Sequence, residues 1–249
     1  MSRIFKYIYL RVIDFILDAL ISRISGSYSY NNKKAYHQIF LYLSNENQTY
    51  LSPNPRVDSR SKNAPVVEIY EFGCGSGATG SALLRAAKAN GILVSRYSGF
   101  DSFQGLQNLN DRDKKRWATG SFRYERDRAE RNIRKNASSE TEVEIIASHF
   151  HELDMICNIS TNDWVIHIDC DLYSSTKESL RICRNLILRG GGIIAFDDYY
   201  SGIMKNVPGE KDAFIEFCED ESLDVCFWSS YSQNGALFIV PTQPNIKAL

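Results

Sequence analysis

Four aspartates stand in two short motifs, each directly after an apolar, β-branched run. Asp169 and Asp171 open Asp-Cys-Asp-Leu-Tyr-Ser-Ser-Thr, and Asp197 and Asp198 open Asp-Asp-Tyr. The apolar runs predict neighbouring strands of a parallel sheet, and ligands bind beyond the carboxyl ends of such strands. Four carboxylates gathered there would repel one another, and a divalent cation would relieve the repulsion. Oxygen ligands favour Mg²⁺, Mn²⁺ or Ca²⁺ over zinc or copper; the alternative is that Asp171 and Asp198 only cap the segments that follow.

A glycine-rich turn joins a predicted strand to a predicted helix and reads Glu71-Phe72-Gly73-Cys74-Gly75-Ser76-Gly77. Glycines allow a tight turn and let the backbone approach a ligand closely. NAD, FAD or S-adenosylmethionine could bind such a turn, but the spacing differs from the G-x-G-x-x-G of dinucleotide binders. A carboxylate two residues before the first glycine suits the ammonium and sulfonium charges of S-adenosylmethionine. We therefore expect Glu71, Gly73, Gly75 and Gly77 to bind this cofactor, the alternative being a turn without a ligand.

Asp101 and Ser102 follow the second predicted strand, where an acid in nucleotide-binding α/β folds accepts hydrogen bonds from ribose hydroxyls. An aspartate at a strand end can also cap a helix, but this topology favours the ribose. His149 and His151 follow the third predicted strand and are candidate pocket residues. His167 lies inside a strand, which indicates a hydrogen-bonded core residue.

Alternation of strand and helix patterns predicts an α/β, Rossmann-like fold with a seven-stranded, mostly parallel sheet and helices on both faces. A turn at Asn234-Gly235 predicts a terminal hairpin that adds an antiparallel strand at the edge of the sheet. Strands are predicted at 66–72, 94–100, 143–147, 164–168, 193–196, 225–228 and 236–240, and helices at 78–89, 122–135, 175–188 and 209–220.

The first 64 residues are predicted to form a helical extension and a loop before the main domain at 65–249. Residues 4–24 are apolar apart from one narrow helical face, and residues 43–64 carry two prolines. Charges interrupt the apolar stretch too often for a spanning helix, and no signal-peptide pattern is clear. We expect the helix to pack on its own domain or to join subunits of a homo-oligomer; peripheral membrane contact is less favoured.

Composition narrows the class of protein. The chain has 249 residues and a formal charge of −1, so it lacks the electrostatic signature of a nucleic-acid-binding protein. None of its six cysteines stands in a C-x-x-C motif, which predicts a reducing, cytoplasmic location. No G-x-S-x-G motif is present, which disfavours a hydrolase.

Several of these segments resemble the macrocin-type sugar O-methyltransferases, a family of class I S-adenosylmethionine-dependent methyltransferases. The similarity extends over about residues 66–240 and is carried by 100–106, 168–176, 190–192 and 197–199. The resemblance implies Mg²⁺ binding by Asp169, Asp197 and Asp198, and a catalytic base at Asp171. It also implies that Glu71 and Gly73 belong to the cofactor loop and that Asp101 binds the ribose.

The expected activity is therefore S-adenosylmethionine- and Mg²⁺-dependent methylation of a hydroxyl on a small-molecule sugar or a glycan. A metal-dependent methyltransferase of a catechol-like phenol is the first alternative. A NAD-dependent sugar oxidoreductase is less favoured, because the glycine spacing of the turn is shorter than that of dinucleotide binders. A non-catalytic scaffold that binds the cofactor is less favoured because all four carboxylates are present.

Overall fold

The computed structural model describes residues 32–44, 65–111, 113–115, 117–157, 162–202 and 207–242. The predicted helix at 4–24 and most of the predicted loop at 43–64 lie outside these ranges, and the domain division at residue 64 stays a prediction. Among the described residues, no helix is both long and apolar enough to cross a membrane.

A seven-stranded sheet forms the centre of the fold, with strand order β3-β2-β1-β4-β5-β7-β6. The pairs of β1 with β2 and β4, of β2 with β3, and of β4 with β5 are parallel, whereas β7 is antiparallel to both β5 and β6. The prediction of a mostly parallel, seven-stranded sheet is confirmed. The antiparallel strand, however, is β7, one place in from the edge, because β6 pairs outside it. The strands are β1 (Val66–Phe72), β2 (Leu93–Asp101), β3 (Glu142–Ala147), β4 (Asp163–Ile168), β5 (Gly192–Phe196), β6 (Cys226–Tyr231) and β7 (Gly235–Val240).

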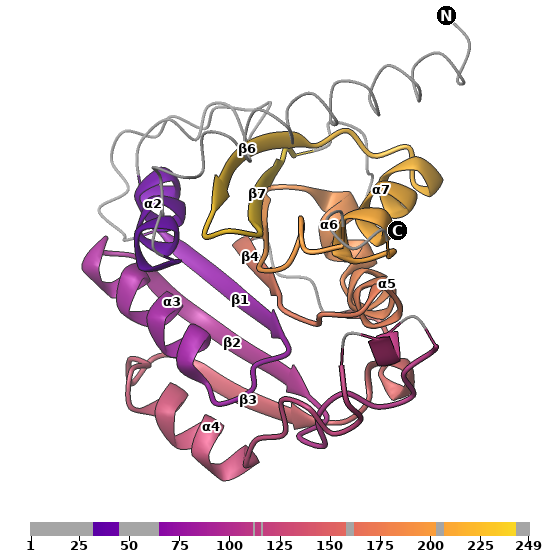
Figure 1. Ribbon diagram of the computed structural model, residues 1–249. Coiled ribbons are helices and arrows are strands. Elements are labelled where there is room, and N and C mark those ends of the chain that lie inside the picture. Colours follow the sequence, from indigo (N-terminus) through magenta and orange to yellow (C-terminus); the bar gives the residue numbers. More distant parts are fainter. Residues whose placement is uncertain are drawn as a thin grey trace, which may run out of the picture.

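Helices cover both faces of this sheet (Figure 1). One buried apolar cluster joins α2, α3 and α4 to the sheet, and a second joins α5, α6 and α7 to it. Because helices lie on both faces, β1 and β4 are buried apart from their first residues, and β5 is buried along its whole length. The helices are α2 (Asn32–Ser44), α3 (Ala78–Ala89), α4 (Arg126–Arg134), α5 (Tyr173–Ile182), α6 (Arg184–Arg189) and α7 (Glu210–Asp220), with short 3₁₀ turns η2 (Asp113–Lys115) and η3 (Phe150–Glu152).

Two helices differ from their predicted extents. The helix predicted at 122–135 begins only at Arg126, because Phe122 adopts a φ of 62°, which no right-handed helix allows. The helix predicted at 175–188 is two helices separated at Cys183, whose φ of −89° and ψ of 4° leave the helical region. Leu180 before the break and Leu186 after it are both fully buried, so the bend keeps both segments on the core.

Helix α2 is part of the same core as the main domain. Tyr36, Ile39, Phe40 and Leu43 are buried, and they belong to the apolar cluster that includes α3. The Tyr36 hydroxyl lies 3.3 Å from Nε2 of His167 in β4. His167 is completely buried, as its predicted core role requires, and burial lowers its pKa to about 4.

Candidate functional site

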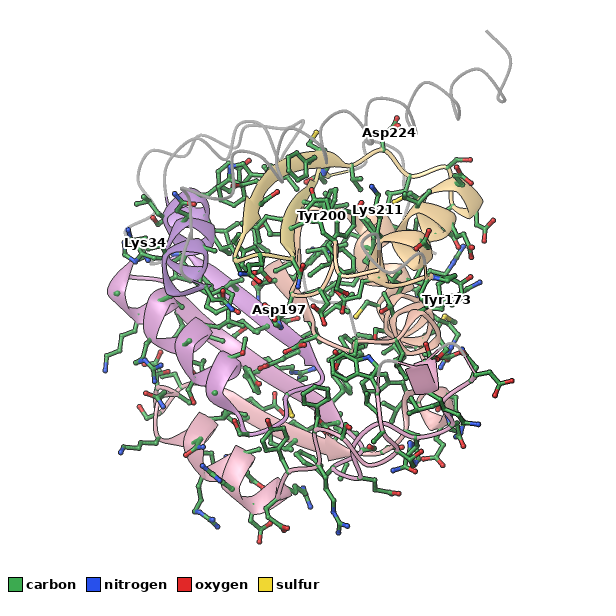
Figure 2. The ribbon with its side chains drawn as sticks, in the orientation of Figure 1. Lys34, Tyr173, Asp197, Tyr200, Lys211 and Asp224 are labelled. Atoms are coloured by element: carbon green, nitrogen blue, oxygen red, sulfur yellow. The ribbon has the colours of Figure 1, made fainter. Side chains whose placement is uncertain are left out.

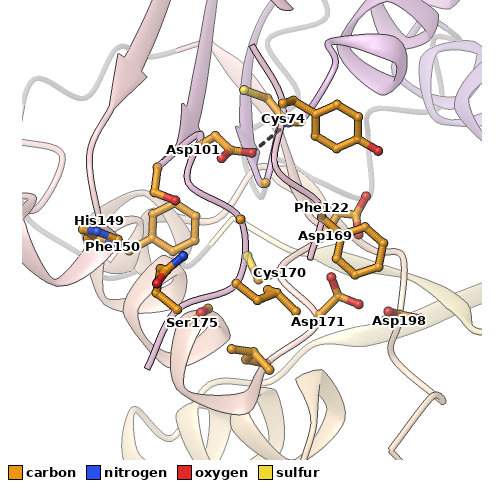
Figure 3. A pocket seen from close by; sticks show the side chains of 18 of the residues that line it. Cys74, Asp101, Phe122, His149, Phe150, Asp169, Cys170, Asp171, Ser175 and Asp198 are labelled. Atoms are coloured by element: carbon orange, nitrogen blue, oxygen red, sulfur yellow. Dashed lines mark hydrogen bonds between the residues drawn. The ribbon is translucent and has the colours of Figure 1, made fainter. Parts of the chain in front are cut away.

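A cavity of about 890 Å³ opens at the carboxyl ends of the parallel strands. Loops after β1, β2, β3, β4 and β5 all contribute to its lining. Figure 3 shows Asp101, His149 and Phe150 on one side of this cavity and Asp169, Asp171 and Asp198 on the other. Its volume lies within the range of about 300–1,000 Å³ typical of ligand sites. The position is the one that the alternating fold predicts for a ligand.

Three carboxylates form a compact acidic group on this cavity. Oxygens of Asp169, Asp171 and Asp198 lie within 4.8 Å of one another. Burial, followed by the charges of Asp197, Asp171 and Asp198, raises the pKa of Asp169 well above its ordinary value. Asp171 has a φ of 60°, in the left-handed region that aspartate tolerates better than most residues. The turn therefore holds the second aspartate of the Asp-Cys-Asp motif beside the first.

Asp197 also lines the cavity but does not belong to this group of three. Burial and the charge of Asp198 raise the pKa of Asp197 to about 6. Its Oδ1 accepts a 3.4 Å hydrogen bond from Asn32 Nδ2, at the start of α2. Figure 2 shows Asp197 in the middle of the view, with Lys34 of α2 to one side and Tyr173 of α5 to the other. The geometry thus groups Asp171 rather than Asp197 with Asp169 and Asp198, and the roles of ligand and base stay predictions.

The glycine turn contributes two of its three predicted glycines to the cavity, Gly73 and Gly75. Gly73 has a φ of 83°, and a Cβ at this position would overlap the backbone carbonyl of Asp169. Only glycine permits this approach, which brings the turn directly against the acidic loop. Gly77 lies outside the lining, with a φ of 74° at the start of α3. A Cβ there would meet the backbone of Ala129 in α4, so Gly77 serves helix packing.

Asp101 and Ser102 both line the cavity, and their contact with a cofactor stays a prediction. Asp101 Oδ2 accepts a 2.8 Å hydrogen bond from the Gly75 backbone N–H, and Oδ1 accepts a 2.7 Å bond from that of Phe103. Burial raises the pKa of Asp101, although these two bonds oppose the shift. The carboxylate therefore holds the glycine turn in place and lines the cavity beside it.

Glu71 does not line the cavity. Its side chain is buried behind the glycine turn and accepts a hydrogen bond from the Tyr97 hydroxyl. Burial raises the pKa of Glu71 to about 8, against the lowering effect of that bond. A direct contact between this carboxylate and a cofactor ammonium is therefore not part of the observed geometry.

His149 and His151, the candidate pocket residues after the third predicted strand, both line the cavity, with their rings stacked at 5.6 Å. Other lining residues escaped prediction from the sequence. Asn234, noted only as part of the hairpin turn, donates a 3.4 Å hydrogen bond from Nδ2 to Asp198 Oδ1. The segment between β2 and α4 adds an aromatic wall, formed by Trp117, Phe122 and Tyr124.

Glu210, the first residue of α7, lies behind the acidic group and is completely buried. Its Oε1 accepts a 3.2 Å hydrogen bond from the Cys170 backbone N–H, and its Oε2 accepts a 3.0 Å bond from that of Asp198. Burial, followed by the charges of Asp169 and Asp198, raises the pKa of Glu210 well above its ordinary value. No local pattern marks this residue, because its partners lie 12 and 40 positions away in the sequence.

Solved structures with a similar fold include two O-methyltransferases. The structure is similar to that of the O-methyltransferase NovP, with a TM-score of 0.55 and 20% sequence identity over 85% of this chain and 79% of NovP. It is also similar to an O-methyltransferase from Bacillus cereus in complex with SAH, with a TM-score of 0.48 and 14% identity over 90% and 88% of the two chains. No curated protein matches the sequence.

A family described as "Methyltransferase domain" matches residues 70–199, just over half of the chain. The matched range contains the glycine turn, Asp101 and all four aspartates of the acidic motifs. The chain therefore belongs to the methyltransferase domain family.

Proposed function

We propose that the protein is an S-adenosylmethionine- and Mg²⁺-dependent O-methyltransferase that acts on a hydroxyl of a sugar or glycosylated acceptor. One observation carries this proposal: the three clustered carboxylates of Asp169, Asp171 and Asp198 line the same cavity as the glycine turn. A methyl donor on the turn and an acceptor oxygen at the carboxylates would share one volume. NovP, whose fold this chain shares, is itself an O-methyltransferase.

The cofactor side of the cavity fits S-adenosylmethionine, which would supply the methyl group. Gly73 and Gly75 expose backbone without side chains, and Asp101 presents a carboxylate beside them. An acid at this strand end can accept hydrogen bonds from ribose hydroxyls. Phe150, also on the lining, offers an apolar surface on the same side of the cavity as Asp101 (Figure 3).

The acidic side fits a hard divalent cation. Its donors are all carboxylate oxygens, the ligands that Mg²⁺ prefers. Burial, followed by the charges of the neighbouring aspartates, raises the pKa of Asp169, and such a cation would relieve the repulsion between these charges. A cation held there would lower the pKa of an acceptor hydroxyl. Asp171 lies close enough to the same group to take the hydroxyl proton, the role that its motif implies.

The aromatic wall and the negative charge of the lining indicate which kinds of acceptor the cavity could bind. Trp117 and Phe122 meet edge to face at 4.9 Å, and Tyr124 lies against Gly75. Aromatic faces of this kind pack against the C–H surface of a sugar ring. No lysine or arginine occurs among the lining residues that the structure describes, whereas six carboxylates do, at Asp101, Asp169, Asp171, Glu178, Asp197 and Asp198. This charge favours an acceptor that is neutral or cationic rather than phosphorylated.

The same aromatic wall favours a second candidate, a metal-dependent O-methyltransferase of a catechol-like phenol. A planar phenol would stack on Trp117 or Tyr124, with its two hydroxyls directed to the carboxylates. The two candidates share the cofactor and the metal and differ in the acceptor alone.

The test is a methyl-transfer assay that follows S-adenosylhomocysteine formation with neutral glycosides, amino sugars and catechols as acceptors. We expect turnover with a vicinal sugar diol, its loss on chelation and its return with Mg²⁺. Asp198→Asn should lower turnover strongly, while Asp154→Asn, an exposed aspartate outside the cavity, should not. Turnover with catechols alone would favour the second candidate, and metal-independent turnover would contradict the proposed metal site.

A further inference from the structure

The two acidic loops are joined by one buried side chain. Glu210 bonds the backbone N–H of Cys170, between Asp169 and Asp171, and the backbone N–H of Asp198. The first bond holds the loop after β4, and the second holds the loop after β5. These two loops supply all three members of the clustered carboxylate group.

A carboxylate is the only common side chain of this length that can serve both loops. Each of its oxygens accepts hydrogen bonds, so both backbone N–H groups are satisfied at once. Glutamine has one acceptor oxygen, and its NH₂ group would face the second backbone N–H as donor against donor. Glutamine would fill the same space as glutamate. The variant Glu210→Gln therefore separates a space-filling role from a role in holding the two loops.

The place of Glu210 adds a second argument. Its carboxylate is completely buried behind the loops that carry Asp169, Asp171 and Asp198. Groups in this second layer orient the residues that ligate a metal, and their loss commonly weakens metal affinity.

We propose that Glu210 is a positioning residue of the metal site, which holds the loops after β4 and β5 so that the acidic group of Asp169, Asp171 and Asp198 keeps its spacing around one divalent cation. This inference rests on the proposed function, since it requires the acidic group to bind a cation. It assigns Glu210 no contact with the acceptor or the cofactor. Its effect on turnover therefore acts through the metal.

The experiment measures Mn²⁺ binding to the full chain by electron paramagnetic resonance of the free ion, for wild type, Glu210→Gln and Glu219→Gln. Glu219 is an exposed residue of the same helix and serves as the matched control. Loss of a residue behind the ligands typically weakens metal affinity about 10- to 100-fold, and we expect this for Glu210→Gln. We expect Glu219→Gln to bind like wild type, and S-adenosylmethionine affinity, measured by calorimetry, to stay within about twofold in both variants.

Activity gives a readout that a general loss of stability would not produce. Saturating Mn²⁺ should return the turnover of Glu210→Gln to within a few-fold of wild type, with the midpoint of the Mn²⁺ titration shifted upwards. Should Glu210→Gln fail to fold, Glu210→Asp replaces it, because aspartate keeps the charge but is too short to reach both backbone N–H groups. The same upward shift of the midpoint is expected.

The outcomes separate the inference from the proposed function. Equal Mn²⁺ affinity in wild type and the Glu210 variants would overturn the positioning role of Glu210 but not the proposal of a metal site. Absence of Mn²⁺ binding in wild type would overturn the metal site and the role of Glu210 with it. A parallel loss of cofactor affinity would show a structural role instead.

Discussion

Replacement of Asp101 by asparagine tests the cofactor side of the cavity. The carboxylate accepts hydrogen bonds from the backbone N–H groups of Gly75 and Phe103, at 2.8 and 2.7 Å. Asparagine keeps one acceptor oxygen, so its NH₂ group must face one of these two donors. The variant also loses the negative charge that a ribose hydroxyl would meet.

The expected magnitude follows from one lost charge-assisted hydrogen bond. Such bonds contribute about 1.5–3 kcal/mol, and about 1.4 kcal/mol corresponds to a tenfold change in binding. We therefore expect S-adenosylmethionine affinity to fall about 10- to 100-fold. Calorimetry well below the melting temperature measures this without interference from unfolding. Asp154→Asn, which makes the same chemical change at an exposed site, is the control.

A pH titration of wild type strengthens the test. Because burial raises the pKa of Asp101, wild-type cofactor affinity should fall as pH is lowered through that pKa, whereas the affinity of Asp101→Asn should not. If the folded variant bound S-adenosylmethionine within about twofold of wild type, Asp101 would not hold the cofactor loop, and the ribose assignment would be refuted.

Three further predictions concern stability and the acceptor. Burial raises the pKa of Glu71 from its ordinary 4.5 to about 8, so between these values the folded state holds a proton that the unfolded state has lost. Wild-type stability should then fall as pH rises through this window, by up to about 1.4 kcal/mol per pH unit; melts from pH 5 to 9 should show a flatter profile for Glu71→Gln, and an identical profile would contradict the raised pKa. In denaturant titrations, Gly77→Ala should lower the free energy of unfolding by more than the about 1–2 kcal/mol that a positive φ costs alanine, because the added Cβ meets the backbone of Ala129. Gly91→Ala is the control: Gly91 has a φ of 68° and open space around it, so only the cost of the positive φ should be seen. A neutral glycoside should have a lower KM than the same sugar carrying a phosphate, since the described lining carries carboxylates and no lysine or arginine; the reverse order would refute the electrostatic argument.

The parts of the site that could be predicted are those that short sequence motifs indicate. Glycines after a strand and aspartates after a buried apolar run identify strand ends directly, and Gly73, Asp101 and Asp169 all reach the cavity. The sheet makes this inference reliable, because the carboxyl ends of parallel strands meet at one edge.

The remaining features depend on contacts between distant segments. Glu210 reaches the acidic loops from α7 and stands in no motif. Asn234 belongs to a turn motif between β6 and β7, but that motif does not predict its contact with Asp198. The grouping of Asp171 with Asp169 and Asp198 depends on the positive φ of Asp171, which residue type alone does not fix. No glycine or proline stands at Cys183 to indicate the helix break there. The break results from packing of both α5 and α6 on one core.

At the edge of the cavity, the residue that follows β1, β4 or β5 is still hydrogen-bonded to the backbone of a neighbouring strand. The backbone N–H of Gly73 donates to the carbonyl of Phe100 at 2.8 Å, and that of Asp169 donates to Phe72 at 2.9 Å. Asp197 continues the series with a 2.9 Å bond to the carbonyl of Ile168. The first residue of each of these three loops is therefore fixed by main-chain bonds that side-chain substitutions leave intact. For this reason the aspartate variants should lose ligand binding before they lose the fold, and a melting temperature near that of wild type should accompany each loss of affinity.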